Sequence, residues 1–221
     1  MRIASWLVSA AALLVVLEPV AGQTIHTPKL KPATRVARAQ EIALARTAAP
    51  SAIADHATIW VLGERGYEKA VEGSNGYGCL VQRGTNGQSM IPRCDDASGV
   101  DALYPVMFLL EEMRSKSNSV TEYTSAVGDG YRTGRFKAPR QGGLSYMYSV
   151  DGFFLTDAGD RIAFTPHVMI YWPNCSVKDL GVSKTEDVPS THLSLLGLGT
   201  PDCHLIINTP PETARKVTAD R

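Results

Sequence analysis

The sequence predicts an α+β fold, in which a largely antiparallel sheet carries a central two-helix insertion and is braced by disulfides. Strand-like runs come first, two segments with helical spacing of apolar residues follow, and strand-like runs return after them. Runs of strands kept apart from runs of helices are typical of α+β proteins, whereas regular alternation would indicate a parallel sheet. Four cysteines behind an export-type leader add the bracing, because two disulfides are the usual outcome in an oxidising compartment.

The first residues have the pattern of an export signal. Arg2 supplies a positive start, an apolar run covers residues 7–17, and small residues precede Gln23. This run is about half as long as a membrane-spanning helix, which needs about 20 apolar residues. We therefore predict a signal peptide over residues 1–22 and an exported bacterial protein, periplasmic or extracellular, with no transmembrane anchor after cleavage.

The rest of the chain divides into a leader, one domain and a tail. Residues 23–52 are predicted to be flexible or weakly helical, because the apolar positions of residues 33–49 are mostly alanine and would bury little surface. Residues 53–210 have the length of a single α+β domain. The polar residues 211–221 follow two prolines and are expected to form a loose tail.

The charge balance and the motifs of the chain argue against several classes of partner and cofactor. The chain carries 22 basic and 22 acidic residues, so its formal net charge is zero. A neutral chain is a poor candidate for nucleic-acid binding. The glycine spacings do not fit a dinucleotide loop, and the cysteine and histidine spacings do not fit a metal site. We therefore expect neither a cofactor nor a metal.

The first part of the domain is predicted to be β-structure. Apolar and β-branched residues fill residues 58–62, which Gly63 bounds, and residues 67–71 are predicted as a second strand that ends before Gly73. A hairpin follows, with strands at residues 78–83 and 88–93 around an Asn-Gly turn. One apolar face of this hairpin is expected to contain Cys79, Val81, Met90 and Cys94.

The register of this hairpin predicts one disulfide. If Asn86 and Gly87 form a two-residue turn, Cys79 lies opposite Cys94, and direct cross-strand neighbours are within disulfide range. The same register places Pro92 in the ladder, where we expect a bulge or an edge position, because proline has no N–H. Cys175 and Cys203 then pair by elimination.

Two helices are predicted in the middle of the chain. Apolar residues recur at helical spacing from Val106 to Met113, and Asp101 is predicted as the N-cap of this helix. A second helix is expected to begin at Ser119, because Ser119 and Glu122 have the spacing of a capping box. Gly134 is the expected C-terminal cap.

The second half of the domain returns to strands. Residues 144–150 and 167–172 have strand character, and residues 203–208 form the last predicted strand. A second hairpin is expected between residues 153 and 164, around a turn of aspartates and glycine. Residues 174–181 are predicted to be a loop with one helical turn.

Three motifs occur together in this chain. They are NG-x-x-C at residues 75–79, GY-x-x-GRF-x-APR at residues 130–140 and PH-V-M-x-Y at residues 166–171. The combination, which spans about residues 55–210, resembles a family of exported bacterial proteins of unknown function. The family pattern includes Cys79 and Cys94 but not Cys175 and Cys203, so a second disulfide would be particular to this protein. The resemblance implies no catalytic residues.

The segment after the second helix concentrates positive charge. It carries Arg132, Arg135, Lys137 and Arg140 without an acid among them. One interpretation is structural, because Arg132 and Arg135 fall at a predicted helix C-terminus, where cations are favoured. The other interpretation is functional: these cations, with Tyr146 on the next strand, would bind a small anionic or polar ligand or an envelope component.

Two histidines suggest an alternative function. His167 and His204 each open a predicted buried strand, where a histidine is either hydrogen-bonded for structural reasons or available for acid–base chemistry. A small secreted hydrolase would need both a nearby acid and a pocket around one of them. The sequence has neither an HExxH motif nor a complete nucleophile elbow. Ligand binding and hydrolysis therefore both stay open as hypotheses.

Overall fold

A computed structural model describes residues 27–156, 158–187 and 193–217. The predicted signal peptide, residues 1–22, lies outside the described residues, and so do the last four residues of the predicted tail, 218–221. Asp157, in the turn of the second predicted hairpin, also lies outside them.

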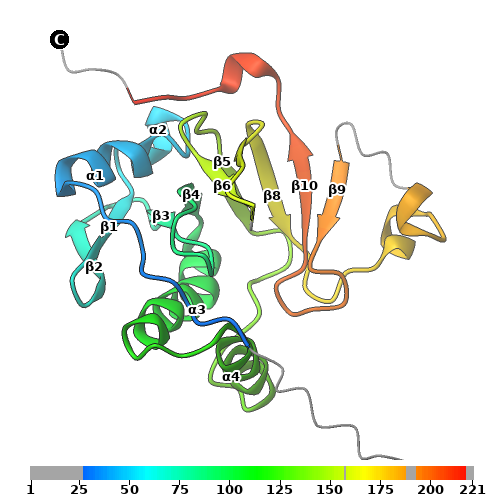
Figure 1. Cartoon of the computed structure of the whole chain (residues 1–221). Helices are drawn as coiled ribbons and strands as arrows, with labels where there is room; N and C mark the ends of the chain where they lie inside the picture. Colours follow the sequence, from blue (N-terminus) through cyan, green and yellow to red (C-terminus); the bar gives the residue numbers. More distant parts are fainter. Residues whose placement is uncertain (1–26, 157, 188–192, 218–221) are drawn as a thin grey trace, which may run out of the picture.

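An eight-stranded sheet organises the molecule, in the order β2-β1-β3-β4-β5-β8-β10-β9 (Figure 1). The strands are β1 Thr58–Gly63, β2 Gly66–Val71, β3 Gly78–Gln82, β4 Ile91–Asp95, β5 Leu144–Met147, β8 His167–Tyr171, β9 Leu193–Leu196 and β10 His204–Asn208. Neighbours pair antiparallel except β1 and β3, which are parallel. A separate hairpin pairs β6 Phe153–Leu155 with β7 Arg161–Ala163.

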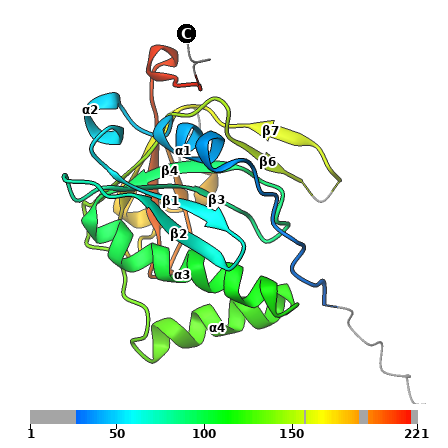
Figure 2. The same ribbon diagram turned by 90° about the vertical axis from the view of Figure 1, so that its left-hand side faces the viewer.

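Helices cover both faces of this sheet. They are α1 Arg38–Arg46, α2 Ser51–Ala54, α3 Ala97–Ser115 and α4 Val120–Arg132, with short 3₁₀ turns at Val177–Leu180, Thr185–Asp187 and Pro211–Thr213. Figure 2 shows α1 on one side of the sheet and α3 on the other, with α4 beyond α3. We call the two sides the α1 face and the α3 face. The predicted α+β fold, with two helices inserted between strands of a largely antiparallel sheet, is confirmed.

The core on the α1 face corrects the prediction for the leader. Ala45, Ala48 and Ala49 are fully buried in one cluster with residues of β1, β3 and β4. The Sγ atom of Cys94 lies 3.8 Å from the carbonyl oxygen of Ala45. Alanine was expected to bury too little surface, but its small side chain lets the helix backbone approach the sheet closely. Residues 41–49 are therefore packed on the core rather than forming a frayed leader.

The core on the α3 face is built around aromatic residues. Leu80 of β3 packs against Leu103, Tyr104 and Met107 of α3, and Tyr171 of β8 joins the same cluster. Leu80 and its neighbour Cys79 belong to different clusters, because successive side chains of a strand point to opposite faces of the sheet. This alternation decides which residues face the helix pair.

The predicted hairpin register and its disulfide are confirmed. The predicted two-residue turn at Asn86 and Gly87 is wrong, because the strands end at Gln82 and begin again at Ile91, and the N–H of Gly87 donates to the carbonyl of Gly84. Cys79 pairs with Cys94 in the ladder, with their Cα atoms 4.1 Å apart, and Val81 pairs with Pro92. So short a Cα separation is typical of a non-hydrogen-bonded pair, and Val81 and Pro92, two residues along, are of the same type. Pro92 therefore needs no N–H toward β3. On its other side the pairing with β5 covers only Cys94 and Asp95, so neither a bulge nor an edge strand is required.

The ends of α4 are as predicted from the sequence, whereas the start of α3 is not. Ser119 and Glu122 form the predicted capping box, and Gly134, with φ of 77°, follows α4. The prediction that Asp101 caps α3 is wrong. The N-cap is Asp96, whose side chain accepts a hydrogen bond from the N–H of Gly99, so the helix begins five residues earlier and Pro105 lies inside it.

Two further differences concern the end of the chain. Strand β9 was not predicted, because its sequence LSLL is only four residues long and contains no β-branched or aromatic residue. The tail was expected to be loose from residue 211, yet Arg215 forms a bridge to Ser149, and the N–H of Arg215 donates to the carbonyl of Tyr148. The N–H of Val217 donates to the Asp151 carboxylate, so the described part of the tail is docked.

The disulfides place the protein in an oxidising environment. Cys175 pairs with Cys203, at a Cα separation of 5.7 Å, as expected by elimination. Two disulfides in one domain indicate export from a reducing cytosol. Among the described residues, no helix has both the length and the apolar character that a bilayer crossing requires.

Candidate functional site

The α3 face of the sheet contains a cleft that combines apolar walls with convergent polar groups. Its volume is about 260 Å³, and helices α3 and α4 close it against β4, β5, β8 and β10. Its apolar wall consists of Ile91, Leu103, Val106, Met107, Met147 and Met169, with Phe154 and Leu196 at the exposed rim. Its polar groups belong to Gln82, Arg93, Tyr123, Tyr131, Asp202 and His204. We call this cavity the sheet–helix cleft.

Strand pairing explains why these residues meet. His204 of β10 lies opposite Tyr171 of β8 on one side and opposite Leu196 of β9 on the other. Met169, two residues before Tyr171, therefore faces the same way. On β4, Arg93 and Asp95 flank the disulfide-bonded Cys94, so they point to the α3 face while the disulfide points to the α1 face.

A buried ion pair forms the polar floor beside the cleft. Arg93 donates to both carboxylate oxygens of Asp95, from Nε at 2.8 Å and from a terminal nitrogen at 2.5 Å. Burial favours a raised pKa for Asp95, but the charge and hydrogen bonds of Arg93 overcome it, so the pKa of Asp95 lies below its usual value. Gln82 accepts a further hydrogen bond from Arg93 at 3.1 Å. Both members of the pair are therefore charged and held in place.

Two tyrosines complete this floor. The hydroxyl of Tyr171 donates to Asp95 at 2.5 Å, and the hydroxyl of Tyr104 donates to the carbonyl of Gly78 at 2.6 Å. Burial, reinforced by the negative charge of Asp95, raises the pKa of both phenols well above the usual value. Both therefore remain neutral donors, and the carboxylate of Asp95 already has two partners inside the fold.

His204 presents a hydrogen-bond acceptor to the cleft. Its Nδ1 lies 2.5 Å from the main-chain carbonyl oxygen of Asp202. A carbonyl only accepts, so Nδ1 carries the proton and, in the neutral ring, Nε2 keeps its lone pair. Burial lowers the pKa of His204, and the nearby charge of Arg93 adds to this effect. The neutral form of the ring is therefore the one favoured near neutral pH.

Helix α4 contributes two tyrosines from the other side. Burial, followed by the charge of Asp202, raises the pKa of Tyr123 and of Tyr131 to about 12. The hydroxyl oxygen of Tyr131 is sealed from solvent and has no hydrogen-bond partner among the described residues. A buried hydroxyl without a partner is unfavourable by about 1–3 kcal/mol, so a bound molecule that supplies the partner would relieve this loss.

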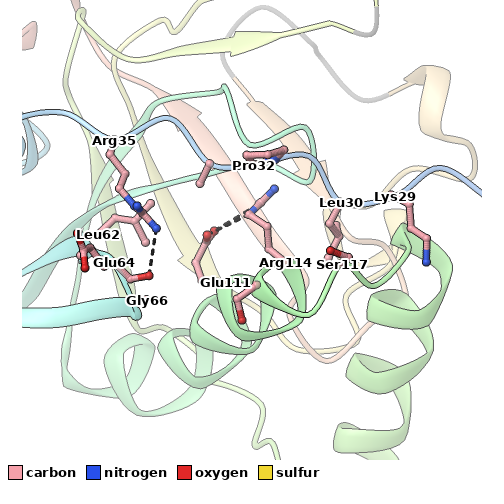
Figure 3. Close-up of a pocket in the computed structure, with 13 residues that line it drawn as sticks. Lys29, Leu30, Pro32, Arg35, Leu62, Glu64, Gly66, Glu111, Arg114 and Ser117 are labelled. Atoms are coloured by element: carbon pink, nitrogen blue, oxygen red, sulfur yellow. Dashed lines mark hydrogen bonds and ion pairs between the residues drawn. The ribbon is translucent and has the colours of Figure 1, made fainter.

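A second cavity, shown in Figure 3, is larger but chemically closed. Its volume is about 470 Å³, and it lies between α3, the β1–β2 turn and residues 27–36, a segment that we call the strap. Arg114 donates to the Glu111 carboxylate and to the carbonyls of Lys31, Gly84 and Thr85. The buried charge of this cavity therefore fastens the strap to the domain, and we assign the cavity a structural role.

The structure does not bring the residues of the predicted basic site together in a cavity. Arg132, Arg135, Lys137 and Arg140 are all exposed, and none of them lines the sheet–helix cleft or the strap cavity. Arg132 forms an ion pair with Asp129 on its own helix, Arg140 lies 3.7 Å from Asp96, and Arg135 stacks on the ring of Phe136. Three of the four cations therefore have local partners. Tyr146 is on the α1 face, packed between Tyr77 and Tyr148.

The two predicted histidines do not form one site. His204 pairs with Tyr171, which follows His167 by four residues on β8, so the two histidines are separated by about 13 Å along the strands. His167 has its Nδ1 2.7 Å from the carbonyl of Thr165, and burial lowers its pKa. Only His204 lines the cleft.

Sequence reasoning missed most residues of the cleft, although one signal was present. Cys94 is predicted on the apolar face of its hairpin strand. Arg93 and Asp95 are its direct neighbours in sequence, so their side chains must point to the opposite face, where the two opposite charges lie together. The spacing of Tyr123 and Tyr131 places both on one side of a helix, but it gives no sign of a cavity. Asp202 carried no signal, because its position depends on the disulfide of Cys203.

Comparisons with known proteins do not assign the site. No protein-family model, no curated protein and no solved structure matches the chain. Within the ranges that the structure describes, no group of three or more histidine, cysteine and carboxylate side chains could hold a metal ion. The function must therefore be inferred from the cleft itself.

Proposed function

We propose that this protein binds a small, mainly apolar ligand in the sheet–helix cleft, and that it does so outside the cytoplasm, in the periplasm or the medium. The observation that carries the proposal is a single cavity in which apolar walls meet Tyr131, Asp202 and His204. Ligand pockets commonly have this composition: mostly hydrophobic lining with a few polar groups that fix orientation.

The wall supports an apolar ligand body. Met107, Met147 and Met169 line the cleft from three different elements, and methionine side chains adapt their shape to a bound molecule. The volume of about 260 Å³ lies just below the usual range of small-molecule sites, so the ligand is small. The exposed rim residue Leu196, 54 % accessible, adds apolar surface at the entrance.

The two hypotheses drawn from the sequence receive less support. The basic segment offers exposed cations, two of which already have an acidic neighbour, and exposed ion-pairing groups contribute little binding energy. For a hydrolase, the Nδ1 of His204 would be expected to face a carboxylate that orients the ring, whereas it faces the main-chain carbonyl of Asp202. Ligand binding in the cleft needs neither feature.

Methionine methyl groups provide the test. The mature chain would contain five methionines, of which Met107, Met147 and Met169 line the cleft. Met113 lies elsewhere on α3, and Met90 lines a separate cavity beside α1, so both serve as controls that report binding outside the cleft. In a protein labelled with ¹³C at the methionine methyls, a fragment library is expected to yield ligands that shift the three cleft signals and leave the two controls unchanged.

The opposite pattern would refute the proposal. If fragments shift only Met90 and Met113, or if no fragment shifts the three cleft methyls, the cleft is not a binding site. A true ligand also stabilises the fold, by about 2.7 kcal/mol at a concentration of 100 times its Kd, so thermal melting of the same samples gives an independent check.

A further inference from the structure

We infer that the sheet–helix cleft, if it binds a ligand as proposed above, selects an amine: a small molecule with an ammonium head and an apolar body. The inference rests on the proposed function and adds the chemical class of the ligand. Three features carry it, namely the charge balance of the lining, the acceptor atoms that face the cavity and the aromatic rings beside them.

The charge balance leaves one carboxylate uncompensated. Arg93 and Asp202 are the two described residues of the lining whose side chains end in a guanidinium or a carboxylate. Arg93 already has a counter-ion in Asp95, which accepts two hydrogen bonds from it, and the remaining effect of its charge falls on the ring of His204. Asp202 accepts a hydrogen bond from the Thr200 hydroxyl at 2.7 Å, and no ion pair to it occurs in the part of the chain that the structure describes. A cation is therefore favoured in the cleft and an anion is disfavoured.

The acceptors point to a head group that donates hydrogen bonds. The Nε2 of His204 is an acceptor, because Nδ1 holds the proton against the Asp202 carbonyl. The Asp202 carboxylate accepts as well, and an ammonium group offers three donors and no acceptor. Asp202 and His204 flank Cys203, whose disulfide to Cys175 anchors this stretch of chain. The two acceptors are therefore held in a fixed relation to each other.

The aromatic side chains strengthen the same preference. Tyr123 and Tyr131 line the cleft from α4, and the charge of Asp202 acts on both. A ring face close to a carboxylate is a favourable environment for an ammonium group, through cation–π attraction together with charge pairing.

Three compounds of nearly equal size test the inference. They are 2-phenylethylamine, 2-phenylethanol and phenylacetate, and each is titrated at pH 7.5 into the oxidised protein with labelled methionine methyls. The expected order is amine tightest, alcohol about tenfold weaker, which corresponds to 1.4 kcal/mol, and carboxylate weakest. Asp202→Asn should reduce the preference for amine over alcohol about tenfold, and Asp202→Glu should retain it, since it keeps the charge.

A surface control separates the local carboxylate from the overall charge. Asp129→Asn removes an exposed carboxylate on α4 that pairs with Arg132, and it should leave the preference unchanged. Binding of the alcohol or the carboxylate as tightly as the amine would overturn the inference while leaving ligand binding in the cleft intact. An amine preference that survives Asp202→Asn would overturn it too. Failure of all three compounds and of the wider fragment library to move the cleft methyls would instead overturn the proposed function.

Discussion

Three arginines are buried in the part of the chain that the structure describes, and each donates hydrogen bonds to acceptors of the fold. Arg83 is fully buried against Glu41, Arg93 against Asp95, and Arg114 against Glu111 together with several carbonyls. A buried pair contributes little net stability compared with apolar residues, but removal of one partner is unfavourable by about 3–5 kcal/mol, because the other charge is left uncompensated. We interpret these pairs as fixing one arrangement of the strap, the hairpin and the cleft floor.

Titration of the buried histidines should make stability depend on pH. Burial lowers the pKa of both His167 and His204, so between the folded-state pKa and the ordinary value of about 6.5 the unfolded chain binds more protons than the folded one. The free energy of unfolding should therefore decrease as the pH falls below about 6.5, by up to about 1.4 kcal/mol per pH unit for each histidine.

Urea unfolding at pH 7.5, 6.5 and 5.5 measures this slope. A double variant, His167→Gln with His204→Gln, should flatten it, while His56→Gln at an exposed position should keep the slope of the original protein. A double variant with an unchanged slope would show that these two histidines are not responsible.

At the scale of elements, helix α4 shows how two nearby glycines differ. A Cβ atom added to Gly130 would lie 2.2 Å from the ring of Phe136, whereas a Cβ atom on Gly128 would have no neighbour within 4 Å. Gly130 is required for the close approach of Phe136, and Gly128 only weakens the helix.

Alanine substitutions at these positions should therefore have opposite signs. Gly128→Ala is expected to stabilise the protein by about 0.5–1 kcal/mol, because alanine loses less backbone entropy in a helix. Gly130→Ala is expected to destabilise it, because Phe136 must leave its place. Urea unfolding of the two variants provides the comparison, and equal effects of the same sign would contradict this account of α4.

The elements also show what could be predicted from the sequence. Strands β1 and β8 were predictable because apolar and β-branched residues are continuous there, and the register around Cys79 followed from centring the hairpin on Asn86 and Gly87. The prediction that the alanine-rich segment of α1 buries little surface was wrong, since the pattern of alanines alone does not show that a sheet packs against it. Strand β9 was missed because its pairing is supplied by β10, a partner later in the chain.

The candidate site was less predictable than the fold. Arg93, Tyr131 and Asp202 come from a strand, a helix and a loop, and only the pairing order of the sheet brings them to one cavity. The charged run around Arg135 suggested a binding site because its cations are close together in the sequence. A cavity, however, depends on which faces of the helices and strands pack together, and the density of charge along the sequence says little about this packing.

At the scale of the whole molecule, the two disulfides brace opposite halves of the sheet. Cys79–Cys94 joins β3 to β4 and closes a separation of 15 residues, while Cys175–Cys203 closes 28 residues and secures the chain before β10. Loop-closure entropy predicts that each is worth about 3–4 kcal/mol. Paired alanine variants, Cys79→Ala with Cys94→Ala and Cys175→Ala with Cys203→Ala, should lose about that much in urea unfolding.

Two outcomes would contradict this estimate. A pair of alanines without effect would show that the corresponding bridge does not constrain the unfolded chain. A loss far above that range would show that the sheet cannot form its native packing without the bridge. Treatment of the original protein with a reductant, which opens both bridges, provides the comparison for the two variants together.

The strap has a consequence for the order in which the exported chain matures. Thr34 and Lys31 are fastened by Arg83 and Arg114, which follow them by 49 and 83 residues. If the chain is translocated from its N-terminus, the strap therefore reaches the oxidising compartment long before Arg83 and Arg114, the residues that bind it. We expect this stretch to be among the last to become ordered. If residues 1–22 are the predicted signal peptide, a peptidase that removes them would have time to act before the strap is bound to the domain.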